Sequence, residues 1–84
     1  MKKVIITGTS RGIGYEMALQ FAQNGHEVLA VSRKTPKVFL ENQNITCLSI
    51  DIANEEELLQ VKAFVEHSWN NQVDILIHNA GLLI

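Results

Sequence analysis

A glycine-rich turn near the N-terminus is the segment of this sequence with the clearest chemical potential. It reads Thr7-Gly8-Thr9-Ser10-Arg11-Gly12-Ile13-Gly14. Gly8 permits a tight turn, Gly12 removes a side chain where a pyrophosphate approaches the backbone, and Gly14 lets a following helix pack closely. The start of that helix offers free N–H groups and the positive end of the helix dipole to an anion. The turn therefore predicts a phosphate-binding site.

The glycine spacing separates this turn from other phosphate-binding motifs. The pattern is G-x-x-x-G-x-G, whereas the general dinucleotide fingerprint is G-x-G-x-x-G. A P-loop needs Lys and Ser or Thr after its last glycine, and here Tyr15-Glu16 follow. Methyltransferases of similar topology usually end the second strand on an acidic residue, and here Ser32-Arg33 stand there. A purely structural turn is the alternative, but the strand before it and the helix after it favour the phosphate site.

The elements around the turn alternate between strand and helix patterns. Apolar, β-branched runs predict strands at 3–7, 27–32, 45–50 and 73–78. Helical spacing predicts main helices over 12–24 and from Asn54, as N-cap, to about Trp69, with a weaker short helix at 37–42. This order favours parallel strands joined by right-handed crossovers. We therefore predict an α/β fold of one domain, residues 1–84, with a doubly wound parallel sheet.

Composition excludes several classes of protein. The 84 residues carry a net charge of −2 with both signs interspersed, which does not favour binding to nucleic acid or to an anionic membrane. The apolar runs have strand length and are too short to cross a bilayer. Cys47 is the single cysteine, and the three histidines lack metal-ligand spacing, so we expect no internal disulfide and no metal. We expect a cytoplasmic protein.

Two further motifs complete a resemblance. Asp51-Ile52 follow the third predicted strand, and Asn79-Ala80-Gly81 follow the fourth. Together with the glycine-rich turn, and in this order, they resemble the short-chain dehydrogenase/reductase family. The resemblance implies half of a Rossmann-like sheet with strand order 3-2-1-4. The resemblance implies that Asp51 and the Ile52 backbone contact adenine and that the Asn79 motif braces the central strand beside the adenine ribose. His78 stands where the family commonly has Asn, a mainly structural position.

The end of the second predicted strand indicates which cofactor is held. NAD-binding proteins place an acidic residue there to accept from the ribose 2′-OH. Ser32 is neutral, Arg33 follows it, and Arg11 approaches from the glycine-rich turn. Two guanidiniums and a hydroxyl suit a 2′-phosphate, so we predict NADP(H), with Lys34 as a weaker contributor. The alternative is that both arginines are ordinary surface charges.

The predicted cofactor-binding residues come from the three motifs and the end of the second strand. They are Gly8, Thr9, Ser10, Arg11, Gly12, Ile13, Gly14, Ser32, Arg33, Asp51, Ile52, Asn79, Ala80 and Gly81.

The resemblance implies an oxidoreductase that transfers hydride between NADP(H) and a carbonyl or alcohol substrate. The family performs this chemistry with a Ser and a Tyr-x-x-x-Lys pair that follow the Asn-Ala-Gly motif. Tyr15 is the only tyrosine, and Leu19 stands where the Lys would be. We therefore assign no catalytic residue and expect the 84-residue chain alone to be inactive. A non-catalytic nucleotide-binding or self-assembly module is the alternative function.

The fourth predicted strand also indicates a partner. Residues 73–78 are almost continuously apolar, and in this chain they would form an exposed sheet edge. Leu82-Leu83-Ile84 add an apolar tail. We expect self-association through this strand and through exposed helix faces.

Overall fold

A computed structural model of the protein describes residues 1–79. Strands and helices alternate along this part of the chain, as the sequence predicts. They are β1 (Lys3–Thr7), α1 (Gly12–Gln23), β2 (Glu27–Ser32), α2 (Lys37–Leu40), β3 (Ile45–Ser49), α3 (Glu55–Ser68) and β4 (Ile75–His78).

The strands form one parallel sheet in the order β3-β2-β1-β4. β1 lies inside the sheet, where Ile5 pairs with Leu29 of β2 on one side and Leu76 of β4 on the other. The predicted Rossmann-like fold and strand order are therefore confirmed. Because all strands run the same way, their carboxyl ends meet at one edge, where such sheets bind ligands.

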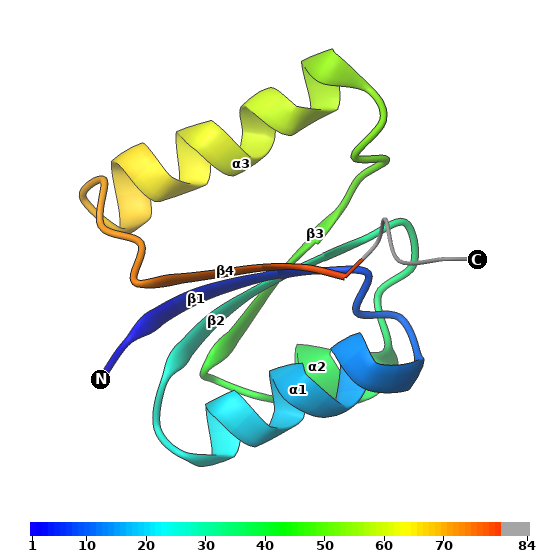
Figure 1. Ribbon diagram of the computed structural model, residues 1–84, viewed down its shortest axis with the longest axis vertical. Helices are drawn as coiled ribbons and strands as arrows, with labels where there is room; N and C mark the ends of the chain where they lie inside the picture. The colour runs from blue at the N-terminus through cyan, green and yellow to red at the C-terminus, as the bar shows by residue number, and fades with distance from the viewer. Residues whose placement is uncertain (80–84) are drawn as a thin grey trace.

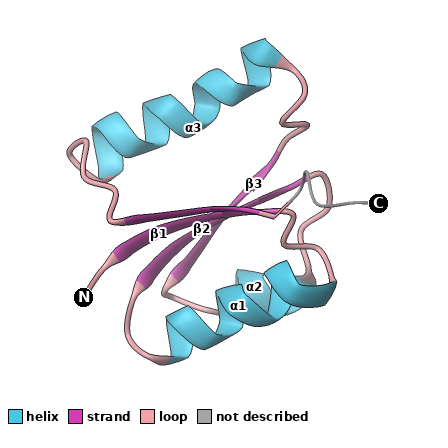
Figure 2. Ribbon diagram, viewed as in Figure 1, coloured by secondary structure: helices cyan, strands magenta, loops and turns pink. Residues whose placement is uncertain are grey.

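Helices cover both faces of the sheet, α3 on one face and α1 with α2 on the other (Figures 1 and 2). Continuous apolar strands suit a sheet that is buried on both faces, because alternate side chains point to opposite sides. Along β1, Val4 and Ile6 pack in the cluster that contains Ala18 of α1, whereas Ile5 packs in the cluster that contains Trp69.

The second cluster attaches α3 to the sheet. Asn54 caps this helix, since its side-chain oxygen accepts from the N–H groups of Glu56 and Glu57 at 2.9 and 3.2 Å. Val61 and Phe64 pack against the buried cluster, and Phe64 meets Trp69 edge to face. The N-cap and the apolar face expected from the sequence are therefore present.

Some boundaries differ from the prediction. β4 begins at Ile75, two residues later than expected. Asp74, directly before it, is joined to Lys3 by two hydrogen bonds: its N–H donates to the Lys3 carbonyl and its carboxylate accepts from the Lys3 N–H. α2 is a single turn that ends at Leu40. Leu58 of α3 stays 40% exposed, so the helix buries less of its apolar face than its spacing indicates.

Cys47 lies on β3 and is only partly buried, packed against the α1 side of the core. Burial raises the pKa of its thiol, which favours the neutral, weakly nucleophilic form.

Among residues 1–79, no three His, Cys, Asp or Glu side chains gather as a metal site, and no helix there is both long and apolar enough to span a membrane.

Truncation of Leu29 tests the core. Leu29 of β2 is fully buried, whereas Leu40 of α2 is 71% exposed. Leu29→Ala should lower the free energy of unfolding by about 2–5 kcal/mol, because it removes buried methyl groups and leaves a cavity. Leu40→Ala, with the same chemical change, should alter it by less than about 0.5 kcal/mol. Urea unfolding followed by circular dichroism measures both, and equal losses would contradict the assigned layers.

Candidate nucleotide-binding site

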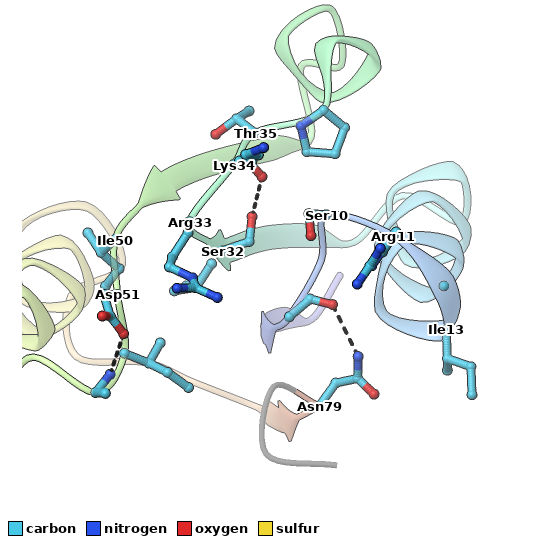
Figure 3. Close-up of a pocket in the computed structure, with 16 residues that line it drawn as sticks. Ser10, Arg11, Ile13, Ser32, Arg33, Lys34, Thr35, Ile50, Asp51 and Asn79 are labelled. Atoms are coloured by element: carbon cyan, nitrogen blue, oxygen red, sulfur yellow. Dashed lines mark hydrogen bonds between the residues drawn. The ribbon is translucent and has the colours of Figure 1, made fainter. Parts of the chain in front are cut away.

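A pocket of about 1350 Å³ opens at the carboxyl ends of the strands. The glycine-rich turn, the segment after β2 and the segment after β3 form its walls, and Asn79 follows β4 (Figure 3). Its lining residues are Gly8, Ser10, Arg11, Gly12, Ile13, Val31, Ser32, Arg33, Lys34, Thr35, Pro36, Ile50, Asp51, Ile52, Ala53 and Asn79.

Two glycines of the turn have backbone conformations that require glycine. Gly8 and Gly12 have φ of 72° and 68°, in the left-handed region that side chains disfavour. The Gly8 N–H donates to the Val31 carbonyl of β2 at 2.8 Å, which holds the turn against the sheet edge. No atom lies within 4 Å of the position of a Cβ on Gly12, so its backbone faces open space.

Gly14 makes the closest contact of the site. A Cβ built on it would lie 2.2 Å from the Gly8 carbonyl oxygen and 2.8 Å from Nδ2 of Asn79. The Asn79 amide in turn donates to that carbonyl at 3.1 Å (Figure 3). The first turn of α1, the glycine-rich turn and the end of β4 are therefore packed at a distance that only glycine allows.

The N-terminus of α1 has no side-chain cap. Arg11 occupies the N-cap position without forming a cap hydrogen bond, and the first turn contains no acidic residue. α3 differs on both points, because Asn54 caps it and its first turn contains three glutamates. An uncapped helix start attracts an anion through its N–H groups and its dipole. The structure thus leaves this end of α1 in a form that suits a phosphate.

The two arginines reach the pocket from different elements. Arg33 follows β2 and Arg11 precedes α1, and Figure 3 shows both side chains at the pocket. Neither forms an ion pair with a carboxylate of the described residues 1–79. The pocket therefore presents two guanidinium groups that are not ion-paired within that range, with the Asp51 carboxylate in the same lining.

The segment after β2 is held by hydroxyl groups. The Ser32 hydroxyl donates to the Lys34 carbonyl at 2.6 Å, which bends the chain directly after β2. Thr35 Oγ1 lies 2.6 Å from Ser49 Oγ, at the end of β3. The Ser32 hydroxyl, which the sequence predicts as a phosphate ligand, is therefore engaged locally and would have to rotate to donate to a ligand.

Asp51 follows β3 within a compact turn. Its carboxylate accepts from the Ala53 N–H at 2.9 Å, and its own N–H donates to Glu57 Oε1 at 3.2 Å. The Asp51 carbonyl accepts from Asn54, the cap residue of α3. The start of α3 thus holds the loop that carries Asp51 and Ile52 against the pocket.

Most of the predicted site residues gather here. Thr9 and Gly14 do not line the pocket: Thr9 is buried, with its hydroxyl 3.5 Å from the Val31 carbonyl, and Gly14 supports the turn. Ala80 and Gly81 lie outside the described residues. Thr35, Pro36 and Ala53 line the pocket although the sequence did not single them out. Their position directly after strand ends was the available signal.

Residues 2–84 match the family described as short chain dehydrogenase. The chain is 32% identical over 84 residues to a 3-amino-tetrahydro-pyrrolizinone reductase of Xenorhabdus hominickii, covering 99% of this chain and 29% of the relative. It is 37% identical over 82 residues to an NADPH-dependent 1-acyldihydroxyacetone phosphate reductase of Schizosaccharomyces pombe, covering 95% of this chain and 28% of the relative.

Solved structures are also similar to this chain. A short chain dehydrogenase of Leptospira borgpetersenii with bound NAD+ superposes with a TM-score of 0.84 at 29% identity, covering 99% of this chain and 32% of that chain. ElxO with NADP bound superposes with a TM-score of 0.78 at 31% identity, covering 100% of this chain and 37% of that chain. The chain thus spans about a third of the length of these relatives. The family match, the strand order and the glycine-rich turn together show that this chain belongs to the short chain dehydrogenases.

Proposed function

We propose that this chain is the NADP(H)-binding front half of a dinucleotide-binding domain. Relatives bind NAD+ in one case and NADP in another, so the preference must come from the residues of this chain. The observation that carries the proposal is the pair Arg11 and Arg33 at one pocket, with Ser32 in place of an acidic residue at the end of β2. A dianionic 2′-phosphate gains charge-assisted hydrogen bonds there, whereas a carboxylate would repel it.

Each part of the pocket has its own proposed contact. The uncapped start of α1 and the open backbone at Gly12 would hold the pyrophosphate. Asp51 and the Ile52 backbone would contact adenine, and Asn79, with Ala80 and Gly81, would border its ribose. The bound cofactor supplies hydride transfer. The described residues supply binding and orientation for it.

Removal of either guanidinium tests the cofactor preference. Arg33→Ala and Arg11→Ala should each weaken NADPH binding by about 10- to 100-fold, because a hydrogen bond to a charged group contributes about 1.5–3 kcal/mol. NADH binding should change by less than about threefold, since NADH lacks the phosphate. Fluorescence titration measures both dissociation constants. Lys62→Ala, which removes an exposed cation on α3, is the control. Equal affinities of the unaltered chain for NADPH and NADH would contradict the proposal.

Two glycines provide a matched test of the phosphate turn. Gly12 and Gly25 both have positive φ, 68° and 87°, with nothing within 4 Å of a Cβ. Gly12→Ala and Gly25→Ala should each cost about 1–2 kcal/mol of stability, from the left-handed backbone alone. Only Gly12→Ala should also weaken NADPH binding at a temperature where both variants are folded. Equal weakening by Gly25→Ala would show that the turn has no special place in binding.

A reductase activity of the whole protein is the proposal that family membership supports, with hydride passing between NADP(H) and a carbonyl or alcohol. The alternative is a non-catalytic nucleotide-binding or self-assembly module, which the exposed Leu76 on β4 favours. In this chain Tyr15 lies on α1, and position 19 is Leu19. We therefore assign no acid or base for hydride transfer to the described residues.

Turnover distinguishes binding from catalysis. The 84-residue chain, saturated with NADPH and given a panel of aldehydes and ketones, should show no loss of absorbance at the wavelength of the reduced nicotinamide beyond the buffer rate. The physical reason is that no tyrosine paired with a lysine is present to protonate the developing alkoxide. Carbonyl-dependent oxidation of NADPH by the unaltered chain above the buffer rate would contradict this expectation, and Tyr15→Phe would then show whether the only tyrosine takes part.

A further inference from the structure

The segment after β2, residues 33–35, is anchored at both of its ends. Upstream, the Ser32 carbonyl at the end of β2 accepts from the Ile50 N–H at 3.0 Å. Downstream, Pro36 precedes α2, and Phe39 of that helix is buried in the core. Because both anchors belong to the packed sheet and helices, the freedom of the segment depends on the contacts that residues 33–35 make themselves.

Hydroxyl groups supply those contacts. Residues 33–35 form no backbone–backbone hydrogen bond within the part of the chain that the structure describes. The Ser32 hydroxyl donates to the Lys34 carbonyl at 2.6 Å, which joins the segment only to the strand that it leaves. Thr35 Oγ1 lies 2.6 Å from Ser49 Oγ, at the end of β3, and one of these hydroxyls donates to the other. This second bond ties the segment to a neighbouring strand.

The Arg33 side chain is not fixed by packing. Arg33 and Lys34 are exposed, whereas Thr35 is partly buried and lines the pocket. Arg33 forms no ion pair within residues 1–79. Figure 3 shows Arg33 at the pocket, on the stretch between Ser32 and Thr35. A long exposed side chain has many rotamers, so its place at the pocket depends on the backbone from which it projects.

We propose that the Thr35–Ser49 hydroxyl pair positions Arg33 for the 2′-phosphate of NADP(H), a role that rests on the proposed function of the pocket. Ser49 lies outside the pocket lining and is therefore a positioning residue. The pair holds the segment after β2 in its binding conformation before the cofactor arrives. Apparent affinity falls in proportion to the fraction of molecules in the binding-competent conformation. Loss of the pair therefore weakens binding without removing a contact to the ligand.

The effect of this pair is specific to the phosphorylated cofactor. NADPH and NADH share the adenine, the pyrophosphate and the nicotinamide, and they differ in the 2′-phosphate that Arg33 binds. The adenine side of the pocket has its own support, since the Asp51 N–H donates to Glu57 Oε1 and the Asp51 carbonyl accepts from the Asn54 N–H. Ser49 thus acts through the segment that carries Arg33, whereas a general loss of structure would weaken the binding of both cofactors.

The affinities for the two cofactors test the proposal. Ser49→Ala and Thr35→Val should each weaken NADPH binding by about 3- to 10-fold, as expected for the loss of one neutral hydrogen bond, and NADH binding by less than about twofold. Ser49→Thr keeps a hydroxyl and should bind as the unaltered protein does. Thr46→Ala, which removes an exposed hydroxyl from the same strand, is the matched control and should leave both affinities unchanged. Fluorescence titration measures each dissociation constant.

Double variants separate positioning from direct contact. Thr35→Val combined with Ser49→Ala should bind NADPH no more weakly than either single variant, because both substitutions remove the same bond. Ser49→Ala should also have no further effect in an Arg33→Ala background, because the side chain that it positions is gone. Full additivity in either cycle would overturn the proposal. A loss with Thr35→Val that Ser49→Ala does not share would also overturn it, because Thr35 would then be a direct ligand.

Backbone mobility without cofactor gives a readout that is independent of binding. NMR order parameters of Arg33 and Lys34 should fall in Ser49→Ala, because the segment loses its tie to β3, and should stay unchanged in Thr46→Ala. Unchanged order parameters in Ser49→Ala, or equal weakening of NADPH and NADH binding, would overturn the role of the hydroxyl pair and leave the proposed cofactor preference intact. Equal affinities of the unaltered protein for NADPH and NADH would overturn the preference itself, and the role of the pair with it.

Discussion

The parallel pairing of β1 with two neighbours is the constraint on which the rest of the structure depends. β1 lies between β2 and β4, which are separated from it by long stretches of chain. Parallel pairing requires crossover connections, and these place helices on both faces. It also brings the ends of β1, β2, β3 and β4 to one edge. The pocket exists because segments that follow those ends share that edge.

At the candidate site, a close contact joins the start of α1 to the ends of the strands. Gly14 at the start of α1, the Gly8 carbonyl and the Asn79 amide lie so near one another that a methyl group at Gly14 would collide with backbone. The helix start therefore lies directly against the strand ends, where the Asn79–Gly8 hydrogen bond joins two of the three segments. Such packing would favour the proposed phosphate contact, since binding to preorganised N–H groups avoids the cost of ordering them.

The charge on which the proposed cofactor preference depends lies at the carboxyl edge of the sheet. That edge carries Arg11 and Arg33, which form no ion pair with an acid of residues 1–79.

The sequence by itself determined the order of elements, the strand order and most of the residues around the pocket. Apolar runs, helical spacing and glycine positions are local signals, and parallel crossovers leave few topologies for them. Tertiary structure alone decided that β4 starts after the Asp74–Lys3 bonds and that the Ser32 hydroxyl turns to Lys34. It also decided that Gly14 packs on Gly8 and Asn79. These are contacts between atoms whose distances arise only when the sheet assembles, and no local pattern encodes them.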